Sequence, residues 1–324
     1  MKIIVTGGLG HIGSRLIRKL PEEIPGAEII IFDNLQVQRY CSVFHLPENG
    51  VYRFVQGDIL LDDLEEAFKG ADVVVNLAAN TEPEQSVEKE AEVEAVNYTG
   101  TIRVAECCAK LGIMLFFPSS TSVYGSPDKI IDEQTPVTAE SAQSPYAKTK
   151  VKSEEYLKKL GEEKGLQYVV CRFGTIFGIS PGMRFHTAVN KFTWQACNSQ
   201  PLTVWETAYE QRRPYLDIED AVSAICFFIK NQKFDNEIYN VVTLNAAVKD
   251  IVGEIKKHIP NVKIQFVKSK IMNALSYDVS SEKIEKLGFR AQGSFARGVR
   301  DTVELLSGLW QQGSECGDSK DESM

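Results

Sequence analysis

The residues with the clearest chemical potential in this 324-residue chain are a tyrosine and a lysine. Tyr146 and Lys150 are four positions apart at the start of a predicted helix, so the phenol and the ammonium group should lie on one face of it. A free phenol has a pKa of about 10, and a nearby cation favours the phenolate and lowers this pKa toward neutrality. The spacing therefore predicts a general base.

A hydroxyl group should complete this pair. Residues 118–125, PSSTSVYG, end a predicted strand and contain several serine and threonine hydroxyls. We expect one of them to hydrogen-bond the substrate oxygen that Tyr146 deprotonates. A serine-rich capping turn is the alternative, and the presence of Tyr146 and Lys150 makes it the weaker one.

A glycine-rich loop at residues 6–13, TGGLGHIG, predicts a dinucleotide-binding site. The loop directly follows a predicted strand and opens a predicted helix, which is the context that this motif requires. Gly7 permits the tight turn, Gly10 lets the backbone approach a pyrophosphate, and Gly13 lets the helix pack against the sheet. The first N–H groups of the helix and its dipole then favour a phosphate. An ordinary strand–helix turn is the alternative.

Two acidic residues refine this prediction. Asp33 ends the second predicted strand, 20 residues after Gly13, where a carboxylate can accept hydrogen bonds from both ribose hydroxyls of an adenosine. Because a carboxylate there repels a 2′-phosphate, and residues 32–37 contain no arginine, we expect NAD rather than NADP. Asp58 follows the third predicted strand and has two open interpretations, bonding the adenine amino group or capping the next helix.

The elements that must position these residues alternate along the chain. We predict strands at 2–6, 28–32, 52–55, 73–77, 113–118, 168–173 and 238–242, and helices at 11–20, 62–69, 90–111, 145–164, 218–230, 246–257, 280–287 and 296–309. Short apolar strands separated by helices are typical of a parallel sheet covered on both faces. The predicted fold class is therefore α/β, a Rossmann-type doubly wound parallel sheet with a smaller α/β substrate-binding lobe.

The domain organisation follows from one interruption of this alternation. Residues 175–213 are rich in proline, glycine, aromatic residues and arginine, which is typical of a loop-rich ligand-binding insertion. We expect an NAD-binding domain over 1–174, to which 214–244 return. The substrate-binding lobe would consist of 175–213 and 245–311, and 312–324 would form a polar tail.

The composition argues against several classes of protein. Hydrophobic residues make up 43% and the net charge is −8, so disorder, a fibrous repeat and an electrostatic footprint for nucleic acid are all disfavoured. No apolar run approaches the roughly 20 residues that span a bilayer. The seven cysteines lack CxxC spacing and the N-terminal apolar run is too short for a secretion signal, so we expect reduced thiols in the cytoplasm. Histidines at metal-ligand spacing are absent, so we expect no metal site.

Ten segments in order resemble the NAD-dependent sugar epimerase/dehydratase family of extended short-chain dehydrogenases/reductases, of which UDP-glucose 4-epimerase is typical. These segments are 6–13, 33–35, 57–58, 77–79, Ser86, 97–101, 119–125, 146–150, 172–178 and 213–220. The resemblance implies that Ser120 is the catalytic hydroxyl, Tyr146 the base and Lys150 the residue that holds the nicotinamide ribose.

The resemblance also implies a set of cofactor contacts. Residues 77–79 would pass under the cofactor, and Asn97 would fix the backbone of the active site. The expected contacts to NAD are Gly7, Gly10, His11, Ile12, Gly13, Asp33, Asn34, Asp58, Ile59, Leu77, Ala78, Ala79, Asn97, Tyr146 and Lys150.

The implied reaction is epimerisation of a nucleotide-diphosphate sugar. Tyr146 would remove a proton from a sugar hydroxyl while hydride moves to NAD, and the ketone would take the hydride back on its other face. A reductase or dehydratase on the same scaffold, or a non-catalytic NAD-binding sensor, are the alternatives. The expected substrate contacts are Thr81, Ser120, Thr121, Thr175, Arg184, Lys191, Trp205 and Arg213.

Several of these substrate contacts have a structural alternative. Arg213 matches an arginine that pairs with the substrate diphosphate in the family, and an ion pair with Asp217 or Glu219 is its alternative. Trp205 falls where the family places an aromatic beside the nucleobase, and core packing is nearly as well supported. For Arg184 and Lys191, which could meet a phosphate or a sugar carboxylate, the alternative is a solvated face.

The chain departs from the family at positions that concern the substrate. Thr121 and Ser122 follow Ser120 where the family's dehydratases carry Asp-Glu, and Thr175 replaces an amide. The arginine that often precedes Asp278 is missing. Recognition of the diphosphate is therefore expected to differ. By resemblance, helices 90–111 and 145–164 would pair with those of a second copy in a homodimer.

Overall fold

The computed structural model describes residues 1–81, 89–125, 130–140, 142–268 and 276–307. Ser86, Cys316 and the predicted polar tail 312–324 lie outside the described residues. The other six cysteines are free thiols. Within the described residues, no helix combines the length and the apolar content that crossing a bilayer requires.

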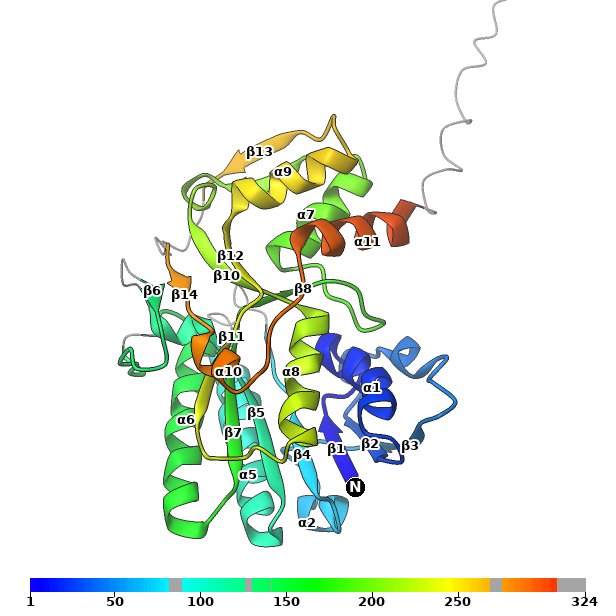
Figure 1. The fold of residues 1–324 in the computed structure, drawn as a ribbon, viewed down its shortest axis with the longest axis vertical. Helices are drawn as coiled ribbons and strands as arrows, with labels where there is room; N and C mark the ends of the chain where they lie inside the picture. Colours follow the sequence, from blue (N-terminus) through cyan, green and yellow to red (C-terminus); the bar gives the residue numbers. More distant parts are fainter. Residues whose placement is uncertain (82–88, 126–129, 141, 269–275, 308–324) are drawn as a thin grey trace, which may run out of the picture.

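A seven-stranded parallel sheet forms the centre of the larger part of the molecule (Figure 1). Its strands are β1 (Lys2–Thr6), β2 (Glu28–Asp33), β3 (Val51–Gln56), β4 (Val73–Asn76), β5 (Met114–Ser120), β7 (Tyr168–Phe173) and β11 (Ile238–Val241). Their order is β11-β7-β5-β4-β1-β2-β3, and neighbouring strands pair in parallel. The order reverses between β1 and β4, so the sheet is doubly wound and the predicted fold class is confirmed.

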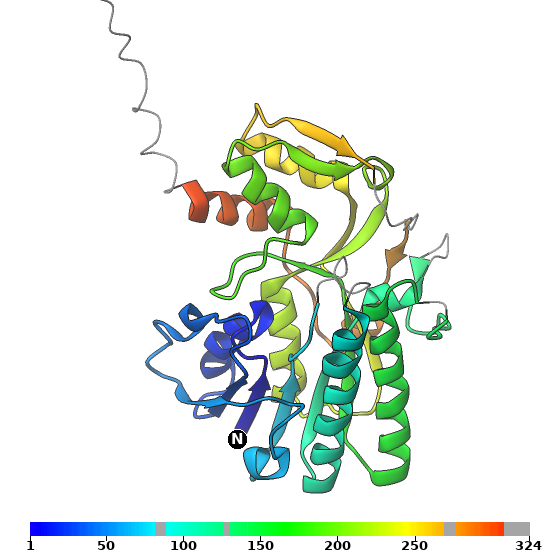
Figure 2. The ribbon, with the colours of Figure 1, turned by 180° about the vertical axis from the view of Figure 1, so that it is seen from behind.

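Helices cover both faces of this sheet because successive strand residues point to opposite sides. On one face, α1 (His11–Glu23) and α8 (Ile218–Lys230) pack side by side over the core residues Ile3, Val5 and Ile29. On the other face, α2 (Leu64–Phe68), α5 (Gly100–Leu111) and α6 (Pro145–Lys164) cover Ile4, Ile30 and Val74 (Figure 2). The predicted helix 90–111 is α4 (Glu90–Glu94), a π-helical turn η2 (Ala95–Thr99) and α5.

A smaller lobe lies beyond the carboxyl ends of the strands (Figures 1 and 2). It contains α7 (Ala188–Cys197), α9 (Val248–His258) and α11 (Phe295–Ser307), a three-stranded sheet of β12 (Leu244–Ala247), β10 (Arg212–Asp217) and β8 (Thr175–Phe177), and the pair β9 (Leu202–Trp205) and β13 (Ile264–Val267). The short pair β6 (Ile130–Ile131) and β14 (Asp278–Val279) and the helix α10 (Glu282–Lys286) flank β11 and α6.

The expectation that 175–213 is rich in loops is wrong in part. Val189, Phe192 and Ala196 recur at helical spacing on α7 and are buried in the core of the smaller lobe, together with Leu202 and Val204 of β9. The prolines and glycines that suggested a loop lie outside these elements, so they mark where the elements end rather than that elements are absent.

The glycine-rich loop gives a test of this packing. A Cβ atom on Gly13 would lie 2.6 Å from the Gly7 carbonyl oxygen and 2.8 Å from the Gly8 carbonyl carbon. We expect Gly13→Ala to lower the free energy of unfolding by about 2 kcal/mol or more, because rigid backbone must move. Urea unfolding measures it.

The matched control is Gly253→Ala in α9, where a Cβ atom would meet no atom within 4 Å. This helical site should become more stable by about 1 kcal/mol. Equal effects of the two substitutions would contradict the packing described for Gly13.

Candidate active site

The glycine-rich loop packs directly against the segment that follows β4. Gly7 has a φ of +61°, a conformation that favours glycine, and a Cβ atom there would lie 2.8 Å from the backbone nitrogen of Ala78. A Cβ atom on Gly10 would lie 3.1 Å from the Gly7 carbonyl oxygen and would meet no other atom within 4 Å. The side of Gly10 on which this Cβ atom would stand is therefore open. The loop therefore has the close approach and the open side that a pyrophosphate requires.

The first turn of α1 offers its backbone to this open side. Gly10 is the N-cap of the helix, so the N–H groups of His11, Ile12 and Gly13 have no carbonyl partner within it. The side chain of His11 is buried, and its Nε2 donates to the Gly178 carbonyl at 3.0 Å. Burial lowers the pKa of His11 to about 4, so the ring is neutral. A contact of His11 with the cofactor stays a prediction.

Asp33 lies at the end of β2, beside the loop. One carboxylate oxygen accepts from the Leu9 N–H at 3.0 Å and the other from the Leu35 N–H at 2.9 Å. Each oxygen has a second lone pair, so the carboxylate can still accept from ribose hydroxyls. These two bonds fix the carboxylate at the place where the adenosine ribose is expected.

Asp58 does not cap the helix that follows it, so that interpretation is wrong. Its carboxylate accepts from the Leu60 N–H at 2.7 Å and from the Asn34 side chain at 3.0 Å. Asp63 is the residue that caps α2. A contact from Asp58 to the adenine and one from Asn34 to NAD stay predictions. Ile59 is buried in the core, so it can reach a cofactor only through its main chain.

Asn97 fixes the backbone beyond β4. It is fully buried in the π-helical turn, where its amide accepts from the Asn80 N–H at 2.7 Å and donates to the Asn80 carbonyl at 2.8 Å. The Thr6 hydroxyl accepts from the Ala78 N–H at 3.2 Å. Residues 77–80, which include Leu77, Ala78 and Ala79, are therefore held at both ends against the glycine loop.

Ser120, Tyr146 and Lys150 meet at the carboxyl end of β5. Ser120 ends this strand, and its hydroxyl accepts from the Ser122 N–H at 3.2 Å. The buried Lys150 ammonium donates to the Pro118 carbonyl at 2.8 Å and lies 5.8 Å from the centre of the Tyr146 ring. The predicted side-by-side arrangement of Tyr146 and Lys150 is therefore observed.

The charges around Tyr146 differ from the expectation. Loss of hydration raises the pKa of Tyr146 to about 12, and Ser120 and Arg184 act in the opposite direction. Burial likewise lowers the pKa of Lys150 to about 8, opposed by Glu154. Desolvation is the largest effect on the phenol in the chain by itself, and Lys150 is not among the groups that oppose it, so the predicted lowering of the pKa toward neutrality is not observed here.

Arg184 comes from a loop that reaches from the smaller lobe to the glycine loop. Its guanidinium donates to the Thr81 hydroxyl. The fully buried Asn190 accepts from the Gly178 N–H at 3.1 Å and donates to the Arg184 carbonyl at 2.9 Å, so it holds both ends of this loop. A Cβ atom on Gly182 would lie 2.5 Å from the Gly10 carbonyl oxygen. Gly182 and Asn190 were not singled out from the sequence, because no local pattern announces these long-range contacts.

The guanidinium of Arg213 lies over the Tyr277 ring, 5.3 Å from its centre. The alternative of an ion pair with Asp217 or Glu219 is wrong, because each of these carboxylates pairs with another arginine. These pairs are Arg297 with Asp217 at 2.9 Å and Arg15 with Glu219 at 2.8 Å.

The remaining substrate candidates have varied surroundings. Thr121 is buried and its hydroxyl donates to the Phe173 carbonyl at 3.3 Å, so this hydroxyl is already bonded within the chain. Thr175 begins β8, Lys191 lies in the first turn of α7, and Trp205 ends β9; all three are half-buried in the smaller lobe.

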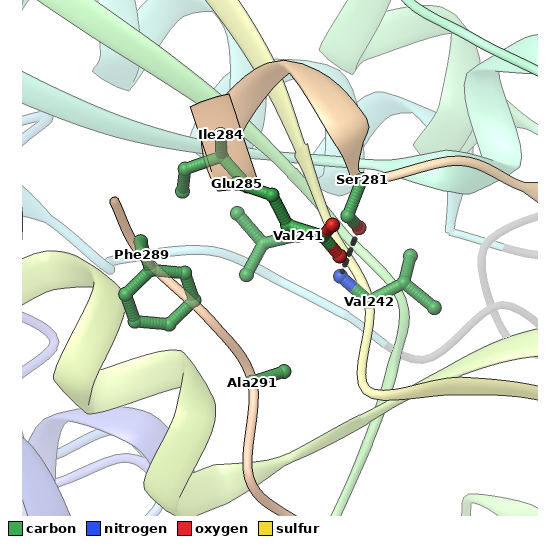
Figure 3. A pocket seen from close by; sticks show the side chains of 7 residues that line it. All are labelled: Val241, Val242, Ser281, Ile284, Glu285, Phe289 and Ala291. Atoms are coloured by element: carbon green, nitrogen blue, oxygen red, sulfur yellow. Dashed lines mark hydrogen bonds between the residues drawn. The ribbon is translucent and has the colours of Figure 1, made fainter. Parts of the chain in front are cut away.

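A separate small cavity lies between β11 and α10, away from these residues (Figure 3). It is lined by Val241, Val242, Ser281, Ile284, Glu285, Phe289 and Ala291, and the Ser281 hydroxyl accepts from the Val242 N–H at 3.1 Å. Its volume of about 10 Å³ has room for one water molecule at most. This cavity is therefore too small for a cofactor or a sugar.

The chain is similar over most of its length to known proteins. A UDP-glucuronic acid 4-epimerase mutant of Bacillus cereus, solved with NAD and a fluorinated UDP-sugar, has a TM-score of 0.87 at 22% identity, covering 96% of this chain and 100% of that one. A dTDP-D-glucose 4,6-dehydratase of Bos taurus is 28% identical over 325 residues, covering 94% of this chain and 88% of the relative.

A protein of Methanocaldococcus jannaschii, provisionally named a UDP-glucose 4-epimerase, is 28% identical over 312 residues, covering 94% of this chain and 98% of the relative. Residues 3–241 match the model of the NAD dependent epimerase/dehydratase family. The cofactor is NAD, and the glycine loop and Asp33 offer the groups to hold it. The chain therefore belongs to the NAD-dependent epimerase/dehydratase family.

Proposed function

We propose that this protein is an NAD-dependent epimerase of a nucleotide-diphosphate sugar. The observation that carries the proposal is the meeting of Ser120, Tyr146 and Lys150 at the end of β5, beside a loop that fits a dinucleotide. The similarity to proteins named for UDP-sugar epimerase activity supports it.

Each catalytic residue has one task in this proposal. The Tyr146 phenolate takes the proton of the sugar hydroxyl that is oxidised, and the Ser120 hydroxyl bonds the same oxygen. The Lys150 ammonium, oriented by the Pro118 carbonyl, would donate to the nicotinamide ribose. Bound NAD supplies the hydride acceptor and a positively charged ring.

Phenolate formation needs positive charge near Tyr146, because loss of hydration raises its pKa to about 12. Arg184 provides part of this charge, since it lowers the pKa of the phenol from its position beside Thr81. We infer that the hydroxyl becomes a base only when the cofactor is present.

Epimerisation is favoured over dehydration by the residues that follow Ser120. Removal of water from a sugar needs a second acid–base pair next to the oxidised carbon, and the family's dehydratases carry Asp-Glu there. This chain has Thr121 and Ser122, which do not titrate near neutral pH. A reductase and a non-catalytic sensor remain as alternatives that the experiments below distinguish.

Recognition of the nucleotide is proposed for the smaller lobe. Arg213, oriented by the Tyr277 ring, would bind the diphosphate, and Trp205 would stack on the base. The neighbouring Arg212 pairs with Asp278 at 2.8 Å, so it does not supply a second diphosphate ligand. A homodimer through α5 and α6 and a cytoplasmic location stay predictions.

Replacing the proposed base tests this mechanism. We expect Tyr146→Phe to lower turnover about 1,000-fold or more, because the proton of the sugar hydroxyl has no acceptor. NAD should stay bound. The assay screens UDP-, GDP-, CDP- and dTDP-sugars and follows product configuration and cofactor redox state.

The control is Tyr156→Phe on the same helix, whose hydroxyl donates to Glu106 at 2.7 Å at the surface. It should retain activity. Conversion by Tyr146→Phe at the rate of the unmodified protein would refute the catalytic assignment, and stoichiometric loss of NADH or NADPH would identify a reductase.

The position of Asp33 predicts cofactor choice. The unmodified protein should bind NAD at least about tenfold more tightly than NADP, a difference of about 1.4 kcal/mol, and Asp33→Ser should reduce this preference. Calorimetric titration with both dinucleotides measures it. Asp63→Ala, which removes the cap of α2, should leave the ratio of affinities unchanged. Equal affinity of the unmodified protein for both dinucleotides would contradict the role of Asp33.

A further inference from the structure

A buried ion pair lies behind Tyr146 and Lys150. Glu154 follows Lys150 by one turn of α6, and Arg172 lies on β7; their exposed fractions are 7% and 4%. Arg172 Nε donates to Oε1 of Glu154 at 3.0 Å and Nη2 to Oε2 at 2.5 Å. This two-point geometry fixes both the distance and the angle between helix and strand.

Ser119 joins this pair to β5. Its hydroxyl donates to Oε1 of Glu154, and it lies directly across from Arg172 in the parallel pairing of β5 with β7. Because side chains alternate along a strand, Ser119 points toward α6, on the same side of the sheet as Phe117. One carboxylate therefore binds the helix of Tyr146 to the strand of Ser120 and to the neighbouring strand.

A second bond joins the same helix and strand one residue away. The Lys150 ammonium donates to the Pro118 carbonyl at 2.8 Å. Pro118 and Ser119, the two residues before Ser120, are thus bonded to two residues one turn apart on α6. These bonds leave little freedom in the distance between Ser120 and Tyr146.

We propose that Glu154, together with Arg172 and Ser119, is a positioning residue that fixes Ser120, Tyr146 and Lys150 relative to one another and supplies the negative charge that balances Lys150. The proposal rests on the catalytic roles assigned above, and its main test, the titration of Lys150, requires no turnover.

The energetics argue for a role beyond stability. Burying an ion pair is often no better for stability than apolar residues of the same size. Among the described residues, Nη1 of Arg172 has no hydrogen-bond partner, although the guanidinium lies 4.7 Å from the centre of the Tyr124 ring. The pair leaves this buried N–H group of Arg172 without a partner in the described part of the chain, which costs stability, and it contacts both α6 and β5. Its presence is best explained by the geometry that it imposes on these two elements and by the charge that it places near Lys150.

The charges that face Lys150 determine its protonation. Burial lowers its pKa to about 8 and Glu154 opposes this shift. From its own helix it faces Glu154 and Tyr146. Arg172 of β7 pairs with Glu154 on the side away from Lys150. Tyr124, in the turn after β5, packs on Arg172. The two members of the pair should therefore act on Lys150 with opposite sign.

The test is to titrate Lys150 by NMR in protein with 13C-labelled lysine, with the Cε resonance assigned through Lys150→Met. The unmodified protein should titrate near pH 8. Glu154→Gln should lower this midpoint by about one pH unit, because negative charge is removed. Arg172→Met should raise it, because Glu154 is no longer neutralised.

The matched control is Asp217→Asn, which breaks the ion pair between the buried Asp217 and the half-exposed Arg297 and touches neither β5 nor α6. It should reduce stability and leave the midpoint unchanged. If the midpoint is unmoved by Glu154→Gln, or shifts in the same direction in both single variants, the pair is only a structural brace and the proposal is overturned.

Either single variant can fail to fold, because it leaves one buried charge unpaired. The double variant Glu154→Gln with Arg172→Met removes both charges at similar volume. We expect it to fold and to titrate below the unmodified protein, since Glu154 has the larger effect of the two charges on Lys150. A folded double variant with an unchanged midpoint would overturn the proposal. A protein that converts no nucleotide sugar would contradict the proposed function and leave this titration intact.

Ser119→Ala tests the geometric part, because it keeps the ion pair and removes the bond to β5. On a sugar that the unmodified protein converts, kcat should fall about tenfold or more, with KM and the Lys150 midpoint unchanged. An unchanged kcat would show that Ser119 does not help to position Ser120.

Discussion

The burial of one ammonium group, that of Lys150, is the constraint on which the rest of the site depends. An isolated buried charge is very costly unless it is paired and hydrogen-bonded. Here the Pro118 carbonyl accepts from it at 2.8 Å, the Phe117 ring lies under it at 4.5 Å, and Glu154 follows it by one helical turn. Glu154 in turn needs Arg172, which lies on the next strand of the sheet. The buried charge of Lys150 therefore requires that β5 pair with β7 and that α6 pack over both strands. The apolar core requires the same arrangement.

A second set of contacts connects the cofactor loop to the smaller lobe. The ring of His11 bonds the Gly178 carbonyl, Gly182 packs on the backbone of Gly10, and Asn190 holds both ends of the connecting loop. Arg184 at the end of this loop acts on Tyr146. The loop that approaches the pyrophosphate and the charge that favours the phenolate thus belong to one connected structure. This arrangement explains how a chain with a net charge of −8 can hold anionic ligands through local positive groups.

Much of the fold was predictable because its signals are local. The strand at Lys2–Thr6 and the helix Ile218–Lys230 have the predicted bounds, and the φ of +61° at Gly7 is the one that the glycine suggested.

The predictions that failed depend on burial or on distant partners. Asp63, not Asp58, caps α2 because the helix begins later than the apolar pattern indicated. The pKa of Tyr146 rises because partial burial removes hydration from its phenol, which spacing along a helix cannot reveal. Neither Glu154 nor Gly182 was identified, since each acts through residues on other elements.

The central claim is that the protein removes hydride from one sugar carbon and returns it to the same carbon. The most direct measurement uses a nucleotide sugar that carries deuterium at the reacting carbon, in ordinary water, with the product examined by NMR and mass spectrometry. The account predicts inverted configuration at that carbon, full retention of the deuterium there, and no net change in NAD. Movement of the deuterium to another carbon, its loss to solvent, or stoichiometric formation of NADH would contradict it.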